Sequence, residues 1–317
     1  MRMLLLIFTF LSSIAYASDF VVLDMKDYYD ESHRSQFIKE LSSGFHDVGV
    51  VIVTNTGINR ELVTRAFRAM ERFFALDEKI KRKYEGIDHY ERGYLPFRSE
   101  KGIGAVEGDY KEIYHFGKDN NQYPIEIDIQ DSISPYFREL ENYMHIFQEA
   151  IAISMGMPTG FFIPMTNEGE SILRAIHYPP HLGVWAEEHT DTDLFSIFPK
   201  ATLDGLEIKN SEGNWIKVDV PEGGMIITVG QFLENLSNGY FRAGRQRVVS
   251  YKKQLDRYAL GFFVHPRDSI SLAPLPKMIE KTGGMKKYGD LNRREFLIQT
   301  MRTLYDRTAE PNLKGTS

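Results

Sequence analysis

The residues best suited to chemistry in this 317-residue chain are the run His189-Thr190-Asp191. Side chains of a β-strand alternate between its two faces, so on a strand the histidine and the aspartate would share a face. One imidazole nitrogen and one carboxylate oxygen would then lie side by side. This pair supplies two of the three ligands in the two-histidine, one-carboxylate set that holds non-haem Fe(II) and leaves coordination positions open. Alone, the pattern is a weak indication of a metal site.

The composition restricts which other sites the chain can contain. Cysteine is absent, which excludes disulfides, zinc–thiolate sites, iron–sulfur clusters and thiol nucleophiles. The formal net charge of −6 argues against a nucleic-acid-binding surface, and no run of Lys and Arg contradicts this. The apolar and charged fractions are ordinary for a soluble globular protein, and the length allows a large core.

The first 17 residues have the pattern of a secretory signal peptide. A short basic start, Met1-Arg2-Met3, precedes an apolar run from Leu4 to Leu11, and Ala15-Tyr16-Ala17 fits a cleavage site. We therefore predict that residues 1–17 are removed and that the mature protein is exported, to the periplasm or the medium, with no membrane segment. The alternatives are an uncleaved anchor, for which the apolar run is short, or a chain that stays in the cytoplasm.

The elements that must position these residues fall into two regions. For residues 18–125 the apolar pattern predicts an N-terminal α/β region. Its strands are expected at 20–24 and 50–53, with a helix around 37–45 and a second helix that Asn59 caps and that runs to about residue 74. Residues 85–131 contain scattered glycines and are expected to be irregular.

For residues 126–317 the pattern changes to a long helix followed by β-rich sequence. The helix is expected over 135–155, with Gly156 as its stop. Short strands are expected at 194–198, 206–208, 215–218, 225–229, 248–251 and 258–264. Strands at this spacing are typical of a sandwich or barrel, and a last helix near 290–305 should pack outside it.

Segments along most of the mature chain are similar, in collinear order, to one enzyme family. They include Gly49-Val50-Val51-Ile52-Val53-Thr54-Asn55-Thr56-Gly57-Ile58, Gly93-Tyr94, Lys111-Glu112, Leu173-Arg174, His177-Tyr178-Pro179-Pro180, His189-Thr190-Asp191, Arg247-Val248-Val249 and Arg257-Tyr258-Ala259. With these segments the chain resembles the isopenicillin N synthase-like 2-oxoglutarate/Fe(II) dioxygenases.

This resemblance implies an α+β fold with a double-stranded β-helix, or jelly roll, as core, and with flanking and N-terminal helices. Fe(II) would lie in the mouth of the jelly roll, with 2-oxoglutarate as co-substrate and O2 and a small molecule as substrates. Hydroxylation, desaturation and cyclisation all occur in the family, and the fold does not choose among them.

The second histidine of the family's metal site is missing. Its place, 55 positions after Asp191 and before Arg247-Val248, is taken by Gln246. None of the nine histidines lies between 190 and 264 to replace it. An amide oxygen is a weaker donor than imidazole, and a more oxygen-rich set favours Mn, Mg or Ca. Three interpretations remain open: a weaker iron site of His189, Asp191 and Gln246, a site for another metal, or a lapsed site.

The resemblance also indicates a 2-oxoglutarate site. Arg257 takes the place of the arginine that clamps the far carboxylate of 2-oxoglutarate, for which a bidentate fork is suited. Ala259 replaces the family's serine beside it, while Tyr178 offers a phenolic donor. The structural alternatives are an ordinary strand-edge arginine and a packed core tyrosine.

Further residues near the motifs have weaker indications. Arg174 and His177 are candidates for lining the pocket, with a structural role equally open. His265 is expected to be a surface or turn histidine, and Glu187 and Glu188 are expected to be solvated. Trp185 and Phe195 could contact substrate, although aromatic residues at such positions usually belong to the core.

The resulting hypothesis is an exported Fe(II)- and 2-oxoglutarate-dependent oxygenase that acts on a small molecule. The alternative is a catalytically lapsed jelly-roll protein that keeps the pocket for a small ligand. The lost histidine and the export signal favour this alternative, because Fe(II) and 2-oxoglutarate are mainly cytoplasmic reagents.

Overall fold

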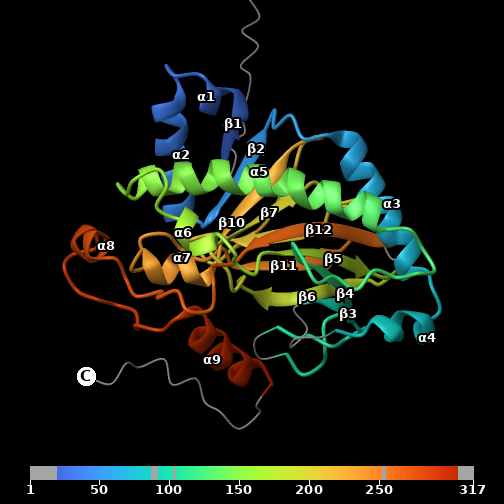
Figure 1. Ribbon diagram of the computed structural model, residues 1–317. Coiled ribbons are helices and arrows are strands. Elements are labelled where there is room, and N and C mark those ends of the chain that lie inside the picture. The colour runs from blue at the N-terminus through green and yellow to red at the C-terminus, as the bar shows by residue number, and fades with distance from the viewer. Residues whose placement is uncertain (1–19, 87–91, 103–104, 252–254, 306–317) are drawn as a thin grey trace, which may run out of the picture.

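The computed structural model describes residues 20–86, 92–102, 105–251 and 255–305 (Figure 1). The expected signal peptide, residues 1–17, lies outside these ranges. In the described part of the chain, no helix is both long enough and apolar enough to cross a membrane.

Two sheets form the centre of the molecule (Figure 1). The larger has eight strands in the order β1-β2-β10-β7-β12-β5-β4-β3, and the smaller has four in the order β6-β11-β8-β9. The strands of the larger sheet are β1 (Val21–Asp24), β2 (Val50–Thr54), β10 (Met225–Val229), β7 (Phe195–Pro199), β12 (Arg257–Val264), β5 (Ile172–Tyr178), β4 (Glu112–Phe116) and β3 (Gly93–Leu95). Those of the smaller sheet are β6 (Gly183–His189), β11 (Gln246–Ser250), β8 (Leu206–Lys209) and β9 (Trp215–Lys217). Apart from the parallel pair β1–β2, neighbouring strands are antiparallel, as a jelly roll requires.

Helices surround this core, and the long helix α5 crosses the larger sheet (Figure 1). The helices are α1 (Met25–Tyr29), α2 (Arg34–Asp47), α3 (Arg60–Phe74), α4 (Glu78–Lys81), α5 (Gln130–Ser154), α6 (Ile163–Thr166), α7 (Gln231–Leu236), α8 (Pro276–Lys281) and α9 (Arg293–Tyr305), with one 3-10 turn, η1 (Arg82–Tyr84). The predicted α+β class with a jelly-roll core and flanking helices is confirmed.

The predicted ends of two helices are close to those observed. Asn59 caps α3, because its side chain accepts hydrogen bonds from the backbone N–H groups of Glu61 and Leu62, at 3.0 and 3.3 Å. Gly156 ends α5 with a φ of +69°, a conformation that glycine adopts readily.

Helix α5 begins at Gln130, five residues before the predicted start, and therefore contains Pro135. Proline has no N–H for the carbonyl four residues earlier, which belongs to Asp131. Arg65 of α3 donates to that carbonyl at 2.8 Å. Pro135 suggested a later helix start. The contact from Arg65 satisfies the Asp131 carbonyl that the proline leaves without a donor, so the helix can begin earlier.

The prediction that residues 85–131 are irregular is wrong. Strands β3 and β4 lie there, and β4 pairs with β5 from Glu112–His177 to Phe116–Leu173. All five residues of β4 (Glu112–Phe116) are buried, including the polar Glu112 and His115. Its sequence therefore does not alternate regularly between buried apolar and exposed polar residues, the pattern by which a strand is recognised. The larger sheet therefore joins strands from both predicted regions of the chain.

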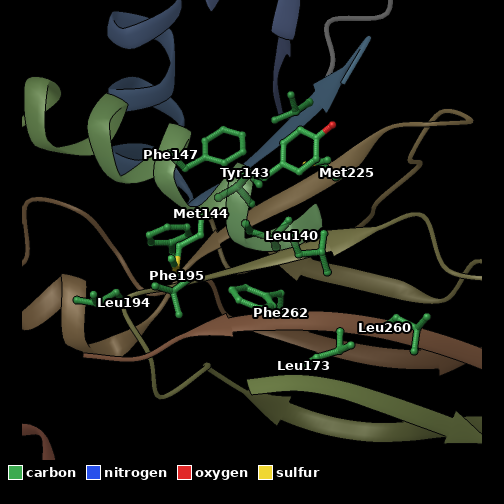
Figure 2. Close-up of a cluster of buried hydrophobic side chains, with 14 of the residues drawn as sticks. Leu140, Tyr143, Met144, Phe147, Leu173, Leu194, Phe195, Met225, Leu260 and Phe262 are labelled. Atoms are coloured by element: carbon green, nitrogen blue, oxygen red, sulfur yellow. The ribbon is translucent and has the colours of Figure 1, made fainter. Parts of the chain in front are cut away.

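The hydrophobic core lies between α5 and the helix-facing side of the larger sheet. Figure 2 shows Leu140, Met144 and Phe147 of α5 above Leu173 of β5 and Phe262 of β12. The core positions alternate with the positions that face the other way. On β5 the residues facing away from the core are Ile172, Arg174, Ile176 and Tyr178, and on β12 they are Arg257, Ala259 and Phe263.

The contact by which Asn59 caps α3 should contribute measurably to the free energy of unfolding. Asn59→Ala removes the acceptor for two N–H groups and should lower the free energy of unfolding by about 1 kcal/mol. Asn59→Asp keeps a capping oxygen and should stay near wild type. Urea denaturation of the three proteins measures the difference, and an alanine variant as stable as wild type would contradict it.

Candidate functional site

A cavity of about 840 Å³ lies between the two sheets. Its volume is within the range of small-molecule sites. The residues singled out from the sequence that line it are Arg174, Tyr178, His189, Asp191, Gln246, Arg257, Ala259 and His265. Helix α9 also contributes lining residues, including Arg293 and Leu297. The helix was predicted to pack outside the jelly roll, where Figure 1 shows it, and the structure adds that several of its residues face the cavity.

His189, Asp191 and Gln246 come together in the cavity wall. Strand β6 ends at His189, and Asp191 lies beyond the strand. The expectation that the two side chains share one face of a strand is therefore wrong. The link is made by β11 instead. Its first residue, Gln246, pairs with His189 across the smaller sheet, and Gln246 Nε2 donates to Asp191 Oδ1 at 2.8 Å.

Hydroxyl groups hold the other oxygen of the Asp191 carboxylate. Ser196 Oγ donates to Asp191 Oδ2 at 2.8 Å, and Thr228 Oγ1 lies 3.3 Å from the same atom. Ser196 Oγ is also 2.6 Å from Asp193 Oδ2. Burial, reinforced by the charge of Asp191, raises the pKa of Asp193 well above its usual range. A neutral Asp193 can donate to Ser196, which leaves Asp191 as the negative charge of this group.

The His189 ring is oriented as a metal ligand would be. Its Nδ1 lies 2.7 Å from the carbonyl oxygen of Glu187 and donates to it in the neutral tautomer, which leaves Nε2 with a free lone pair. Burial lowers the pKa of His189, and the charge of Lys111 lowers it further. Both effects favour the neutral imidazole that coordinates metals.

The donor set fits a divalent cation, with one weak member. Within the described residues no group of three His, Cys, Asp or Glu side chains could hold a metal, so a third protein ligand must come from elsewhere. Gln246 can provide it through Oε1, because its Nε2 is the atom that bonds Asp191. The candidate donors are then an imidazole nitrogen at the end of β6, a carboxylate oxygen just beyond that strand and an amide oxygen at the start of β11.

Arg257 is a buried guanidinium with an unused donor. It opens β12 opposite Tyr178, is only 5% exposed, and lies with its Cζ 5.0 Å from the centre of the Tyr178 ring. Its Nε donates to the Leu203 carbonyl at 3.0 Å, but Nη1 is buried without a partner. Burial lowers the pKa of Arg257. A buried N–H without an acceptor is costly, and a bound carboxylate would satisfy it. These residues therefore fit the far end of 2-oxoglutarate.

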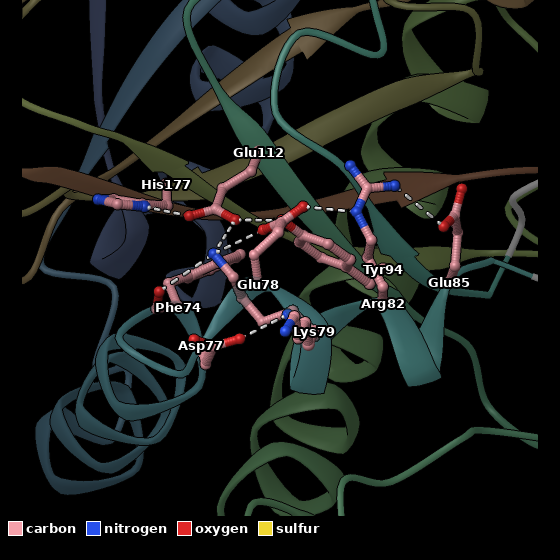
Figure 3. Close-up of polar contacts among 10 residues, drawn as sticks. Phe74, Asp77, Glu78, Lys79, Arg82, Glu85, Tyr94, Glu112 and His177 are labelled. Atoms are coloured by element: carbon pink, nitrogen blue, oxygen red, sulfur yellow. Dashed lines mark hydrogen bonds and ion pairs between the residues drawn. The ribbon is translucent and has the colours of Figure 1, made fainter.

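Arg174 lines the cavity and His177 does not, so for His177 the structural alternative holds. Three positions apart on β5, they face opposite sides of the sheet. His177 Nδ1 lies 2.7 Å from Glu112 Oε1 (Figure 3), beside Phe74 of α3 on the helix-facing side. Its Nε2 lies 2.7 Å from Asp256 Oδ1. Lys81 pairs with the same glutamate at 2.7 Å. His177 is thus part of a buried polar network outside the cavity.

His265 was expected to be a surface or turn histidine; it lies in the loop after β12, but the surface placement is wrong. His265 follows β12 directly, is 8% exposed and lines the cavity. Its Nδ1 lies 2.9 Å from the Glu170 carbonyl oxygen. Burial, together with the charge of Arg293, lowers the pKa of His265 to about 3. His265, the residue after β12, lies in the interior of the protein. Its distance in sequence from the other motifs did not indicate this.

The remaining candidates have structural roles. Trp185 and Phe195 are buried in the core and do not line the cavity, and the Trp185 indole donates to the Pro179 carbonyl at 2.8 Å. Glu187 is exposed, and Glu188 forms ion pairs with Lys209 and Arg245.

Sequence reasoning missed three charged residues of the cavity wall, Glu100, Asp109 and Lys111. They lie in the region expected to be irregular, Asp109 and Lys111 just before β4 and Glu100 twelve residues before it. The only signal was Lys111-Glu112 among the segments similar to the family, and that signal gave no direction for the side chain.

Comparison with known proteins identifies the family. A model described as the non-haem dioxygenase N-terminal region, named for morphine synthesis, matches residues 21–133, and the model of the 2OG-Fe(II) oxygenase superfamily matches residues 169–266. Together they span more than half of the chain. The chain belongs to the 2-oxoglutarate/Fe(II)-dependent dioxygenase family. Iron and 2-oxoglutarate are the cofactor and co-substrate of this family, as the resemblance implied.

Individual relatives support the same assignment. The 2-oxoglutarate-Fe(II) type oxidoreductase hxnY of Emericella nidulans is 24% identical in an alignment of 324 positions that covers 90% of each chain. A 2OG-Fe(II) oxygenase family protein from Caulobacter crescentus is 27% identical, with a TM-score of 0.80 over 89% of this chain and 98% of that one. A Neurospora crassa protein in complex with alpha-KG and thymine is 24% identical, with a TM-score of 0.79 over 90% of this chain and 96% of that one.

The burial of His265 should make the protein sensitive to acid. Between pH 6.5 and about 3 the unfolded chain binds a proton at this histidine that the folded protein does not. Stability should therefore fall as the pH drops through this window, by at most about 1.4 kcal/mol per pH unit from this group. His265→Gln should flatten the dependence, measured by urea denaturation between pH 7.5 and 4.5.

The exposed His145 provides the matched control. His145→Gln should leave the pH dependence as in wild type. An unchanged slope in His265→Gln would show that His265 is not buried in the neutral form.

Proposed function

We propose that this protein is a non-haem Fe(II)- and 2-oxoglutarate-dependent oxygenase that acts on a small molecule. His189, Asp191 and Gln246 would hold the iron, and Arg257 with Tyr178 would hold 2-oxoglutarate. The observation that carries the proposal is the buried Arg257 Nη1 without a partner in the same cavity as the three candidate ligands.

Each metal-site residue has a definite task. His189 presents Nε2 because Nδ1 is directed to the Glu187 carbonyl. Asp191 brings the negative charge, and the Ser196 hydroxyl fixes its orientation. When bound, the iron supplies O2 activation coupled to the oxidation of 2-oxoglutarate to succinate and CO2. The side chains around it orient the ligands and exclude water. Hydroxylation, desaturation and cyclisation of the substrate are all compatible with this site.

Gln246 makes this site weaker than one with two histidines. Its amide oxygen is a poorer donor to Fe(II) than an imidazole nitrogen. Its amide nitrogen also bonds Asp191 Oδ1 at 2.8 Å, which competes with a metal for that oxygen. Nearby Lys111, whose charge lowers the pKa of His189, further disfavours a cation. We therefore expect iron affinity below that of a site with a second histidine.

The proposed 2-oxoglutarate site has fewer polar groups than the family pattern, which has a serine beside the arginine. Arg257 provides the charge, and Tyr178, whose side chain also lines the cavity, provides the nearest phenolic group. Ala259 lies two positions along the same face of β12 and has no hydroxyl to add. The affinity for the co-substrate should therefore depend strongly on the single arginine.

We also propose that the enzyme works outside the cytoplasm. The support is the sequence pattern of residues 1–17, with its basic start, apolar run and small residues at the cleavage site. Mass spectrometry of the N-terminus after expression in a secreting host would test this. A mature chain that begins near Ser18 agrees with the proposal, and a retained Met1 contradicts it.

Replacing Gln246 tests its role as a ligand. Gln246→His should tighten Fe(II) binding at least tenfold, since an imidazole nitrogen replaces an amide oxygen, and Gln246→Ala should weaken it. Anaerobic Fe(II) titration gives the affinities, and succinate release gives turnover. If wild type binds no iron and releases no succinate while Gln246→His does both, the lapsed binding protein is the better description. Equal affinities in all three proteins would show that residue 246 is not a ligand.

Replacing Arg257 tests the co-substrate site. Arg257→Met removes charged hydrogen bonds worth about 1.5–3 kcal/mol and should weaken 2-oxoglutarate binding roughly 10- to 150-fold. Arg247→Met is the matched control, because Arg247 pairs with Glu207 and does not line the cavity. Isothermal titration with 2-oxoglutarate measures both. Similar losses in the two variants would contradict the assignment.

A further inference from the structure

A second group of charges lies in the cavity wall, away from Arg257. It consists of Glu100, Asp109, Lys111 and Arg174, which we call the charged wall. Lys111 Nζ lies 2.7 Å from Asp109 Oδ2 and 3.4 Å from Glu100 Oε2, and Arg174 forms an ion pair with Glu100. None of these residues belongs to the proposed iron or 2-oxoglutarate sites.

The strand register sets the spacing between the backbone positions of Arg174 and of the two co-substrate residues. Tyr178 pairs with Arg257, and Arg174, four residues earlier on the same face of β5, pairs with Gly261. Four residues of strand span about 13 Å. The carbon chain of 2-oxoglutarate has four C–C bonds of about 1.5 Å and cannot exceed about 6 Å. The backbone of Arg174 thus lies farther from that of Tyr178 than 2-oxoglutarate is long, which allows a second molecule to bind at Arg174.

In the charged wall two cations face two carboxylates, and one donor of Arg174 has no acceptor. Lys111 and Arg174 converge on the same oxygen, Glu100 Oε2. The Asp109 carboxylate is occupied, because Oδ2 accepts from Lys111 and Oδ1 lies 3.2 Å from the Glu187 backbone N–H. Arg174 Nε is buried without a partner. Such an N–H is costly to leave unsatisfied, so an acceptor on a ligand would bind here.

The surroundings of Arg174 are apolar and open to the cavity. Its side chain is 19% exposed although it lies in the interior, so this exposure is toward the cavity that it lines. The guanidinium carbon is 5.7 Å from the centre of the Phe263 ring. Ile172 and Ile176 line the cavity on either side of Arg174 along β5. A ligand here would meet the Arg174 guanidinium, which is paired with Glu100, and an apolar wall.

We propose that the substrate of this enzyme is a small organic acid whose carboxylate binds Arg174 and Lys111. Its apolar body lies against Phe263 and Ile176. Arg174 determines the specificity through its Nε and through the charge that it shares with Lys111, and Glu100 and Asp109 hold the two cations in place. This inference rests on the proposed function, because it assigns the substrate end of the same cavity.

Matched probes test the preference for a carboxylate. Benzoate, phenylacetate and hexanoate are compared with their primary amides, by ligand-observed NMR on the full chain under anaerobic conditions with Fe(II) and saturating 2-oxoglutarate. Saturating co-substrate prevents the probes from binding at Arg257. We expect at least one acid to bind tenfold or more tightly than its amide. If no acid binds more tightly than its amide, the inference is overturned.

Variants then connect the preference to Arg174. Arg174→Met should reduce the preference to less than twofold. Arg174→Lys keeps an ion pair with Glu100 but has no Nε, and should reduce it at least threefold even if the methionine variant does not fold. Arg267→Met is the control, because Arg267 also has a buried Nε without a partner but does not line the cavity. A preference that survives both Arg174 variants overturns the assignment.

The 2-oxoglutarate affinity of each protein separates the two proposals. If Arg174→Met binds 2-oxoglutarate within twofold of wild type and loses the preference, both stand. Intact 2-oxoglutarate binding without any preference for acids overturns only the substrate assignment. A preference for acids in a protein that binds no 2-oxoglutarate overturns only the proposed function.

Discussion

The pairing of β5 with β12 is the constraint on which the site depends. Alternate residues of these two strands face the helices and the cavity, so the same pairing builds the core and the binding surface. Leu173 and Phe262 pack under α5, while Arg174, Tyr178 and Arg257 face the cavity. A slip of one residue would exchange the two sets and bury charges in the core, which fixes the register strongly.

Burial of a charge costs folding free energy, and the charged groups around the cavity are stabilised to different extents. Asp191 is surrounded by hydroxyl and amide donors from Ser196, Thr228 and Gln246. The charged wall pairs two cations with two carboxylates. Arg257, among the described residues, has no carboxylate partner at all. The last arrangement is stable only with a ligand or at some cost in folding energy, so it is the clearest structural sign of an anion-binding site.

The replacement of histidine by glutamine changes the donor atom but not its position. The antiparallel register sets residue 246 opposite His189, whichever side chain it carries. The amide is long enough to reach Asp191, and both groups are held in the cavity wall. The three residues of the proposed metal site are therefore held together in the cavity wall, and in that proposal the third ligand would be a weaker donor than histidine. This combination allows iron affinity to be changed without alteration of the fold.

The sequence by itself determined the family, the jelly-roll core, and His189, Asp191, Gln246 and Arg257 as cavity residues, because local motifs in collinear order carry that information. It did not determine which residues meet across strands. Whether His177 or His265 faces the cavity depends on sheet register and on the packing of neighbouring elements. Only the tertiary structure placed β4 beside β5 and assembled the charged wall, since these contacts join residues far apart in the chain.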